Sequence, residues 1–256
     1  MEVDTLRIYP TLSKPPIREA LIDIRVKVPS GFDIYHLNDL DDKIRDTFPT
    51  KQEQTLSQIK LEIKPGAESL QSLQSIATRP GGFRYFSQGK DKIFQARIDG
   101  FTLNKLPPYT TWEELRDEAK RLWLLYKEVA SPEVITRVAL RYINNLNLPA
   151  PIRDFGDYLA VPPVMPEDLP QGLNDFLIRM NAHVPDFEGN AIITQALEPV
   201  SSERTRIPVI LDIDVFKEKV SGINESEVWE ILEALRHFKN KVFFAFITDK
   251  LKEIYR

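Results

Sequence analysis

The sequence contains no cysteine and only three histidines among its 256 residues. Without cysteine there is no disulfide, no thiolate nucleophile and no cysteine-ligated metal, which is typical of proteins in a reducing compartment. The histidines His36, His183 and His237 are dispersed along the chain, and no HExxH motif occurs. We therefore expect them on the surface or on helix faces rather than in a metal site, and we expect no cofactor.

Common nucleotide-binding and hydrolase motifs are also missing. Neither GxGxxG nor GxxxxGK[ST] occurs, and the GxSxG turn of many serine hydrolases is absent. The apolar run Val242–Ile247 is far too short to span a bilayer. The first ten residues, MEVDTLRIYP, lack the apolar stretch of a secretory signal. We therefore expect a cytoplasmic location and no membrane partner.

The charge balance is mildly acidic, with a net charge of -4 and a pI of about 5.6. Such a chain has no general attraction for nucleic acid, so a nucleic-acid partner is not expected. Hydrophobic residues make up 42% and charged residues 28%, which is typical of a globular protein with one large domain or two small ones. An unknown protein or a small molecule remains as the partner, and homo-oligomer formation is left open.

Alternating polar and apolar residues predict several strands. The segment from Ala20 to Val28 has one apolar face, and Glu133–Pro149, just past the middle of the chain, reads as one long strand. A hairpin is predicted from Phe83–Ser87 and Ile93–Leu106. The apolar phase of its second strand changes at Gly100, which predicts a β-bulge there.

Apolar residues at three- and four-residue spacing predict two long helices. The first begins at Thr111, which has capping-box spacing to Glu114, and the second begins near Glu225. A break is expected near Asn240, because bulky aromatic and β-branched residues follow it. Phe32–Phe48 is also predicted to be helical.

Two segments have no clear period. Gly66–Pro80 is interpreted as a loop or a weak hairpin, and Leu173–Val184 as either a helix or a strand.

The order of these elements recurs in the two parts of the chain. Short matches support a repeat: IDGF at 98–101 resembles IDVF at 213–216, and WEEL at 112–115 resembles WEIL at 229–232. A third match, REAL at 18–21 with RVAL at 137–140, aligns Ala20 with Ala139, but these two residues have opposite strand phases. Either this match is accidental or the central strand is buried on both faces. We predict an α+β fold, a mainly antiparallel sheet with long helices packed on it. Residues 1–131 and 132–256 would be halves of a tandem β-α-β(3)-α duplication, similar to the helix-grip and TATA-box-binding-protein arrangements.

Three short motifs carry a resemblance over nearly the whole chain. These are Pro15-Pro16-Ile17 with Glu19, Tyr109 with Trp112, and RYIN at 141–144. In these motifs the chain resembles a sporadically distributed prokaryotic family of uncharacterised proteins of about this length. The resemblance implies a microbial source, and it carries over no activity and no catalytic residue.

Polar residues on the predicted central strands form the candidate binding site. Gln95, Arg97 and Asp99 share one strand face, as do Arg141 and Asn145. If these strands are neighbours, the five side chains could line a concave surface. An internal Arg–Asp salt bridge between strands explains the same pattern, because charged groups in the middle of a sheet need partners.

Two further patterns suggest metal chemistry. Asp212 and Asp214 share a strand face and could hold Mg²⁺ through carboxylate oxygens, although an exposed polar strand face gives the same pattern. Asp46 followed by Glu62 and Lys64 has the loose form of a nuclease core, in which carboxylates bind metal and the lysine steadies the attacking water. Glu62 and Lys64 are equally consistent with the outer face of an ordinary strand.

Two classes of function therefore remain open. The first is a non-enzymatic binding or protein-interaction module, because the sequence shows a complete scaffold without an assembled nucleophile, base or metal set. The second is a metal-dependent nuclease or other hydrolase.

Overall fold

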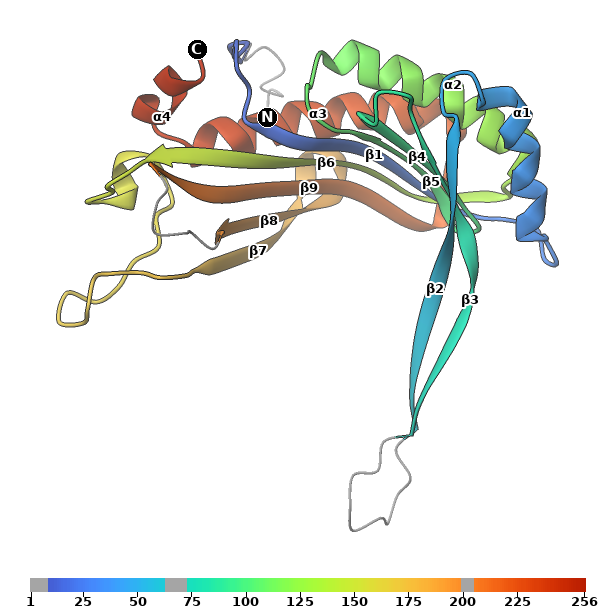
Figure 1. The fold of residues 1–256 in the computed structure, drawn as a ribbon, viewed down its shortest axis with the longest axis horizontal. Helices are drawn as coiled ribbons and strands as arrows, with labels where there is room; N and C mark the ends of the chain where they lie inside the picture. Colours follow the sequence, from blue (N-terminus) through green and yellow to red (C-terminus); the bar gives the residue numbers. More distant parts are fainter. Residues whose placement is uncertain (1–8, 63–72, 199–204) are drawn as a thin grey trace.

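The protein is built on one large antiparallel sheet, and the computed structural model describes residues 9–62, 73–198 and 205–256 (Figure 1). In these ranges the strands are β1 (Ile17–Lys27), β2 (Thr50–Glu62), β3 (Leu73–Phe86), β4 (Lys92–Arg97), β5 (Gly100–Lys105), β6 (Val134–Pro149), β7 (Leu177–Val184), β8 (Gly189–Leu197) and β9 (Arg206–Ile223). Their order across the sheet is β2-β3-β4-β5-β1-β6-β9-β8-β7. The first strand and the long strand β6 are therefore neighbours at its middle.

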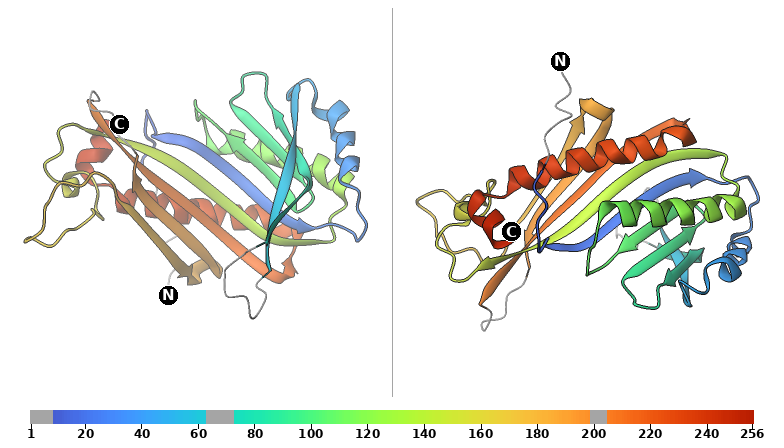
Figure 2. Two further views of the ribbon diagram at one scale, coloured as in Figure 1. Left: turned by 60° about the horizontal axis from the view of Figure 1, so that its bottom comes forward. Right: turned by 90° about the horizontal axis from the view of Figure 1, so that it is seen from above.

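Two helices of 19 residues, α2 (Trp112–Ala130) and α3 (Val228–Phe246), lie on one face of this sheet (Figures 1 and 2). The first is capped at Thr111, whose hydroxyl accepts a hydrogen bond from the Glu114 amide at 3.2 Å. The other helical segments of the described chain are short: η1 (Ile34–Leu40), α1 (Asp41–Ile44), η2 (Phe155–Asp157), η3 (Pro185–Phe187), η4 (Glu225–Glu227) and α4 (Asp249–Ile254). None of the helices is long and apolar enough to cross a membrane, in the part of the chain that the structure describes.

The predicted fold class, with long helices on a sheet and tandem β-α-β(3)-α units, is wrong. A single nine-stranded sheet dominates the described residues, and only two of the helices exceed seven residues. The predicted unit has four strands, whereas the chain before α2 contributes five. Strand content was underestimated because β3 begins inside a segment interpreted as a loop or a weak hairpin, and because β7 lies in Leu173–Val184, which was interpreted as either a helix or a strand. The division at residues 131 and 132 stays a prediction.

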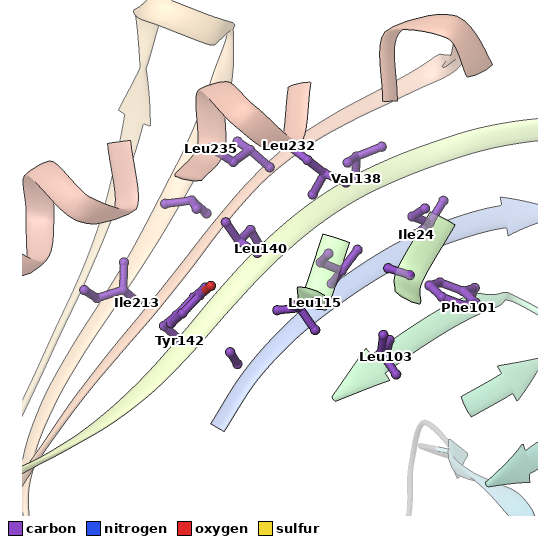
Figure 3. Close-up of a cluster of buried hydrophobic side chains, with 14 of the residues drawn as sticks. Ile24, Phe101, Leu103, Leu115, Val138, Leu140, Tyr142, Ile213, Leu232 and Leu235 are labelled. Carbon is purple, nitrogen blue, oxygen red and sulfur yellow. The ribbon is translucent and has the colours of Figure 1, made fainter. Parts of the chain in front are cut away.

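The apolar core lies between the sheet and the two long helices. Ile24 of β1, Val138 and Leu140 of β6 and Ile213 of β9 have no exposed surface, and they project toward the helices (Figure 3). Helix α3 packs on β6 and β9, and α2 packs on β5 and η1. Because side chains alternate along a strand, the polar residues between these positions are placed on the opposite face.

The predicted bulge at Gly100 is a hairpin turn instead. Strand β4 ends at Arg97 and β5 begins at Gly100, so Ile93–Leu106 is two antiparallel strands rather than one. Gly100 has a φ of +149°, and a Cβ there would lie 2.3 Å from the Ile24 carbonyl oxygen. The change of apolar phase in the sequence therefore marks a reversal of the chain. Only glycine fits at this position, because any side chain would clash with the backbone of β1.

Two other local predictions need correction. The segment Phe32–Phe48 holds the short helices η1 and α1 with a turn after them, not one continuous helix. Helix α3 continues past Asn240 to Phe246, because its apolar side chains pack on the sheet and this burial outweighs their low helix propensity. Of the segment Gly66–Pro80, residues 66–72 lie outside the described ranges.

Candidate functional site

The face of the sheet opposite the long helices carries a charged hollow of about 840 Å³, which we call the sheet-face hollow. The acidic residues that line it are Glu19, Asp23, Asp99, Asp214 and Glu218. The basic residues that line it are Arg25, Lys27, Arg97, Arg137 and Arg141. They come from β1, β4, β6, β9 and the turn after β4, so the register of the central strands assembles the site.

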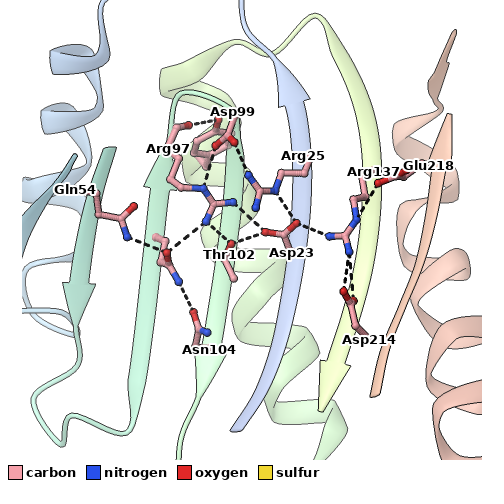
Figure 4. Close-up of polar contacts among 12 residues, drawn as sticks. Asp23, Arg25, Gln54, Arg97, Asp99, Thr102, Asn104, Arg137, Asp214 and Glu218 are labelled. Atoms are coloured by element: carbon pink, nitrogen blue, oxygen red, sulfur yellow. Dashed lines mark hydrogen bonds and ion pairs between the residues drawn. The ribbon is translucent and has the colours of Figure 1, made fainter. Parts of the chain in front are cut away.

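Asp23, on β1, is at the centre of this network (Figure 4). Its Oδ2 accepts hydrogen bonds from Arg97 Nη2 at 2.9 Å and from Thr102 Oγ1 at 2.7 Å. Its Oδ1 accepts from Arg25 Nε at 2.9 Å and from Arg137 Nη1 at 3.0 Å. One carboxylate from the middle of the sheet thus holds three guanidinium groups from three different strands.

The electrostatics of this centre depend on charge compensation. Burial favours the neutral form of Asp23, whose side chain is 7% exposed, but Arg97, Arg25, the Thr102 hydroxyl and Arg137 together hold its pKa below the usual value. Asp99 sits at the β4–β5 turn and pairs with both Arg97 and Arg25. Asp23 is therefore ionised at neutral pH although it is buried.

A second set of ion pairs extends the network toward β9. Arg137 reaches Asp214 at 3.1 Å and Glu218 at 3.3 Å, and Arg141 reaches Asp212 through two hydrogen bonds of 2.8 and 2.5 Å (Figure 4 shows the first two). Burial raises the pKa of Asp214 despite Arg137 and Arg141, and the nearby Asp212 and Asp23 add to the rise. The two arginines therefore compensate the burial of Asp214 only in part.

A row of amide side chains continues the polar surface across β4 and β5 toward β1. Gln95 Nε2 donates to Asn104 Oδ1 at 2.8 Å, and Asn104 Nδ2 donates to Glu19 Oε1 at 2.5 Å. The polar lining is thus tied together by side-chain contacts from β4 to β9. Because most of the charged side chains are held by their neighbours, the arrangement of charges is largely preorganised for a partner.

The structure brings four of the five predicted binding residues together. Gln95, Arg97, Asp99 and Arg141 line the sheet-face hollow. Arg97 and Arg141 also form salt bridges between strands, to Asp23 of β1 and to Asp212 of β9, and the binding role of these residues stays a prediction. Asn145 is not among the lining residues. It lies further along β6, opposite Ile210, and its Oδ1 is buried without a hydrogen-bond partner among the described residues.

The residues considered for metal binding are arranged differently. Asp212 and Asp214 do share a strand face, but the guanidinium groups of Arg141 and Arg137 occupy their oxygens. Across the described residues, no three side chains of the His, Asp and Glu types converge as metal ligands. Asp46 is exposed after α1, whereas Lys64 and the side chain of Glu62 lie outside the described residues.

Sequence reasoning missed Asp23, Thr102 and Arg137 as members of the site. The signal for Asp23 was present, because it alternates with the apolar Ile22 and Ile24. Arg137 has the same strand phase as Arg141. What the sequence did not supply was the strand order that makes β1 the neighbour of both β5 and β6.

Comparisons with known proteins do not identify the chain. No model of a known protein family matches it. A search of curated proteins finds no significant similarity either.

Proposed function

We propose that this protein is a non-enzymatic binding protein that holds a protein partner in the sheet-face hollow. The observation that supports the proposal is a large open polar surface at the middle of the sheet, on the face away from α2 and α3. Most of its charged side chains are already oriented by one another, so little side-chain freedom is lost when a partner docks.

The balance of charge favours a protein segment over nucleic acid. Acidic and basic residues line the hollow in equal number, and a phosphate backbone would meet five carboxylates as well as five cations. A peptide that carries both signs of charge can match both sets, and such complementarity fixes register and selects against other partners. The closed Arg–Asp pairs give no support to the alternative of a metal-dependent nuclease or hydrolase.

The proposal is tested with a charge reversal on the rim of the hollow. Arg141→Glu, whose parent side chain is 40% exposed, replaces attraction for a partner carboxylate with repulsion. Arg121→Glu is the matched control, because Arg121 is 41% exposed on the helical face of the molecule. Proteins that co-purify with the chain from its own cells are identified, and amide hydrogen exchange then maps where each binds.

The proposal is supported by a partner that slows amide exchange in β1, β6 and β9. This partner should no longer co-purify with Arg141→Glu but should still co-purify with Arg121→Glu. If every partner protects the helical face, or binds the two variants equally, the hollow is not the binding surface.

A further inference from the structure

A second cavity, of about 280 Å³, lies on the helical side of the sheet. We call it the Lys239 cavity. Its walls come from residues 9–17, the start of α2, the middle of α3 and the inner face of β6. Phe243, Phe244 and Ile17 supply apolar surface, and Tyr109, Tyr142 and Lys239 supply polar groups. Most residues of the three motifs described for the sequence, from Pro15 to Asn144, line this one cavity.

Lys239 is buried in this cavity and forms no ion pair with any residue that the structure describes. It is only 9% exposed, and the carboxylate that lines the cavity, Glu113, lies against Arg236 at 3.7 Å instead. Its Nζ donates a hydrogen bond to Asn240 Oδ1 at 2.5 Å and lies 3.9 Å from the centre of the Tyr142 ring. A lysine that is desolvated and unpaired in this way is unusual, because burial of an ammonium group is costly.

The surroundings favour the neutral amine. Burial, with the positive charge of Arg236 nearby, lowers the pKa of Lys239 to about 7. Arg236 itself lines the cavity and is engaged only loosely, by Glu113 at 3.7 Å and Glu233 at 3.5 Å. Desolvation and a neighbouring cation are the two conditions that turn a lysine into a nucleophile toward carbonyl compounds.

A pair of tyrosines lies beside the amine. The hydroxyls of Tyr109 and Tyr142 are 2.8 Å apart, and burial raises the pKa of both, so they remain protonated. Both hydroxyls are therefore neutral at neutral pH, and each can donate or accept a hydrogen bond.

We propose that the Lys239 cavity captures a small aldehyde or 2-oxo acid as a Schiff base on Lys239, with Arg236 attracting the carboxylate. The lone pair of Nζ attacks the carbonyl carbon, and the π electrons move to the oxygen, which gives a carbinolamine. The two protons of the amine leave with that oxygen as water, and a C=N bond remains. No oxidant or reductant is consumed, and the capture is reversible. The cavity is separated from the sheet-face hollow by the sheet, so this proposal does not depend on the proposed function.

The test uses reductive trapping on the full wild-type chain. The protein is incubated at pH 7.5 with glyoxylate and sodium cyanoborohydride, and in parallel with acetaldehyde, and modified lysines are mapped by mass spectrometry over time. Lys241, exposed two residues further along α3, is the internal control. We expect Lys239 to be modified at least about tenfold faster than Lys241, since an unprotonated amine is the reacting form.

Two variants separate the amine from its anion-attracting neighbour. Lys239→Arg should remove the fast site and leave modification of Lys241 unchanged. Arg236→Gln should keep the fast site but reduce the preference for glyoxylate over acetaldehyde. Equal modification rates at Lys239 and Lys241 in the folded wild type overturn the Schiff-base site. If the ratio of the Lys239 rate to the Lys241 rate is the same with glyoxylate as with acetaldehyde, the role of Arg236 is overturned.

Discussion

The stability of the sheet is expected to depend strongly on Asp23, the carboxylate at the centre of the polar network. The side chain of Arg97 is only 9% exposed, and in Asp23→Asn it keeps a single carboxylate partner, Asp99. Breaking a buried ion pair from one side typically costs about 3–5 kcal/mol, and the half-exposed Asp99 compensates the buried guanidinium of Arg97 only in part. We therefore expect the free energy of unfolding to fall by about 3–5 kcal/mol.

The matched control is Asp99→Asn, in the same network. Asp99 also pairs with Arg97 and Arg25, but its side chain is 46% exposed, so water can replace it and the expected loss is about 0–1 kcal/mol. Urea unfolding followed by circular dichroism measures both, since urea leaves ionic strength unchanged. A loss of 3 kcal/mol corresponds to a fall in the midpoint of roughly 1–3 M. If Asp23→Asn costs no more than Asp99→Asn, burial of the network does not carry the stability that we assign to it.

Three further outcomes are expected. The pKa of Asp23 is lowered in the folded state from an ordinary value of 3.8, so its stabilisation is complete above about pH 4 and is lost as the pH falls through the lowered pKa. Below about pH 4, the urea midpoint of Asp23→Asn should therefore fall less steeply with pH than that of the wild type. The pKa of Lys239 is lowered from 10.5 to about 7, so a protonated Lys239 destabilises the folded state. Lys239→Met should therefore raise the thermal midpoint at pH 6, and this gain should shrink between pH 7 and pH 10.5. A gain that does not change with pH would contradict this. Gly100→Ala should destabilise by at least about 2 kcal/mol in urea, because its Cβ would meet backbone atoms of β1, whereas Gly172→Ala, with nothing within 4 Å, should be close to neutral.

Local patterns in the sequence predicted the central elements but not their pairing. The alternation around Ile22 and Ile24, the long strand that became β6 and the capped start of α2 at Thr111 are all readable, because each depends on neighbours along the chain. The turn at Gly100 was misread because a bulge and a tight hairpin produce the same change of phase.

The candidate site shows the same limit. Arg97 and Arg141 could be proposed from strand phase, but Asp23 joins Arg97 of β4 to Arg137 of β6 only because β1 is inserted between β5 and β6. Lys239 could not be recognised from its helix, because the aromatic ring and the cavity around it come from β6 and residues 9–17. Contacts of this kind depend on non-local topology, which local periodicity does not encode.

The position of β1 also has a consequence for biosynthesis. Leu21 is made long before its partners Asn104 and Arg141. At about 5–20 residues per second, the first strand waits for several seconds on the ribosome before either flank is available. Both sides of the nascent β1 are unsatisfied during that interval, and pairings so distant along the chain form slowly. The emerging polypeptide is therefore most vulnerable to off-pathway association before β6 has left the exit tunnel, and chaperone occupancy should peak over that window.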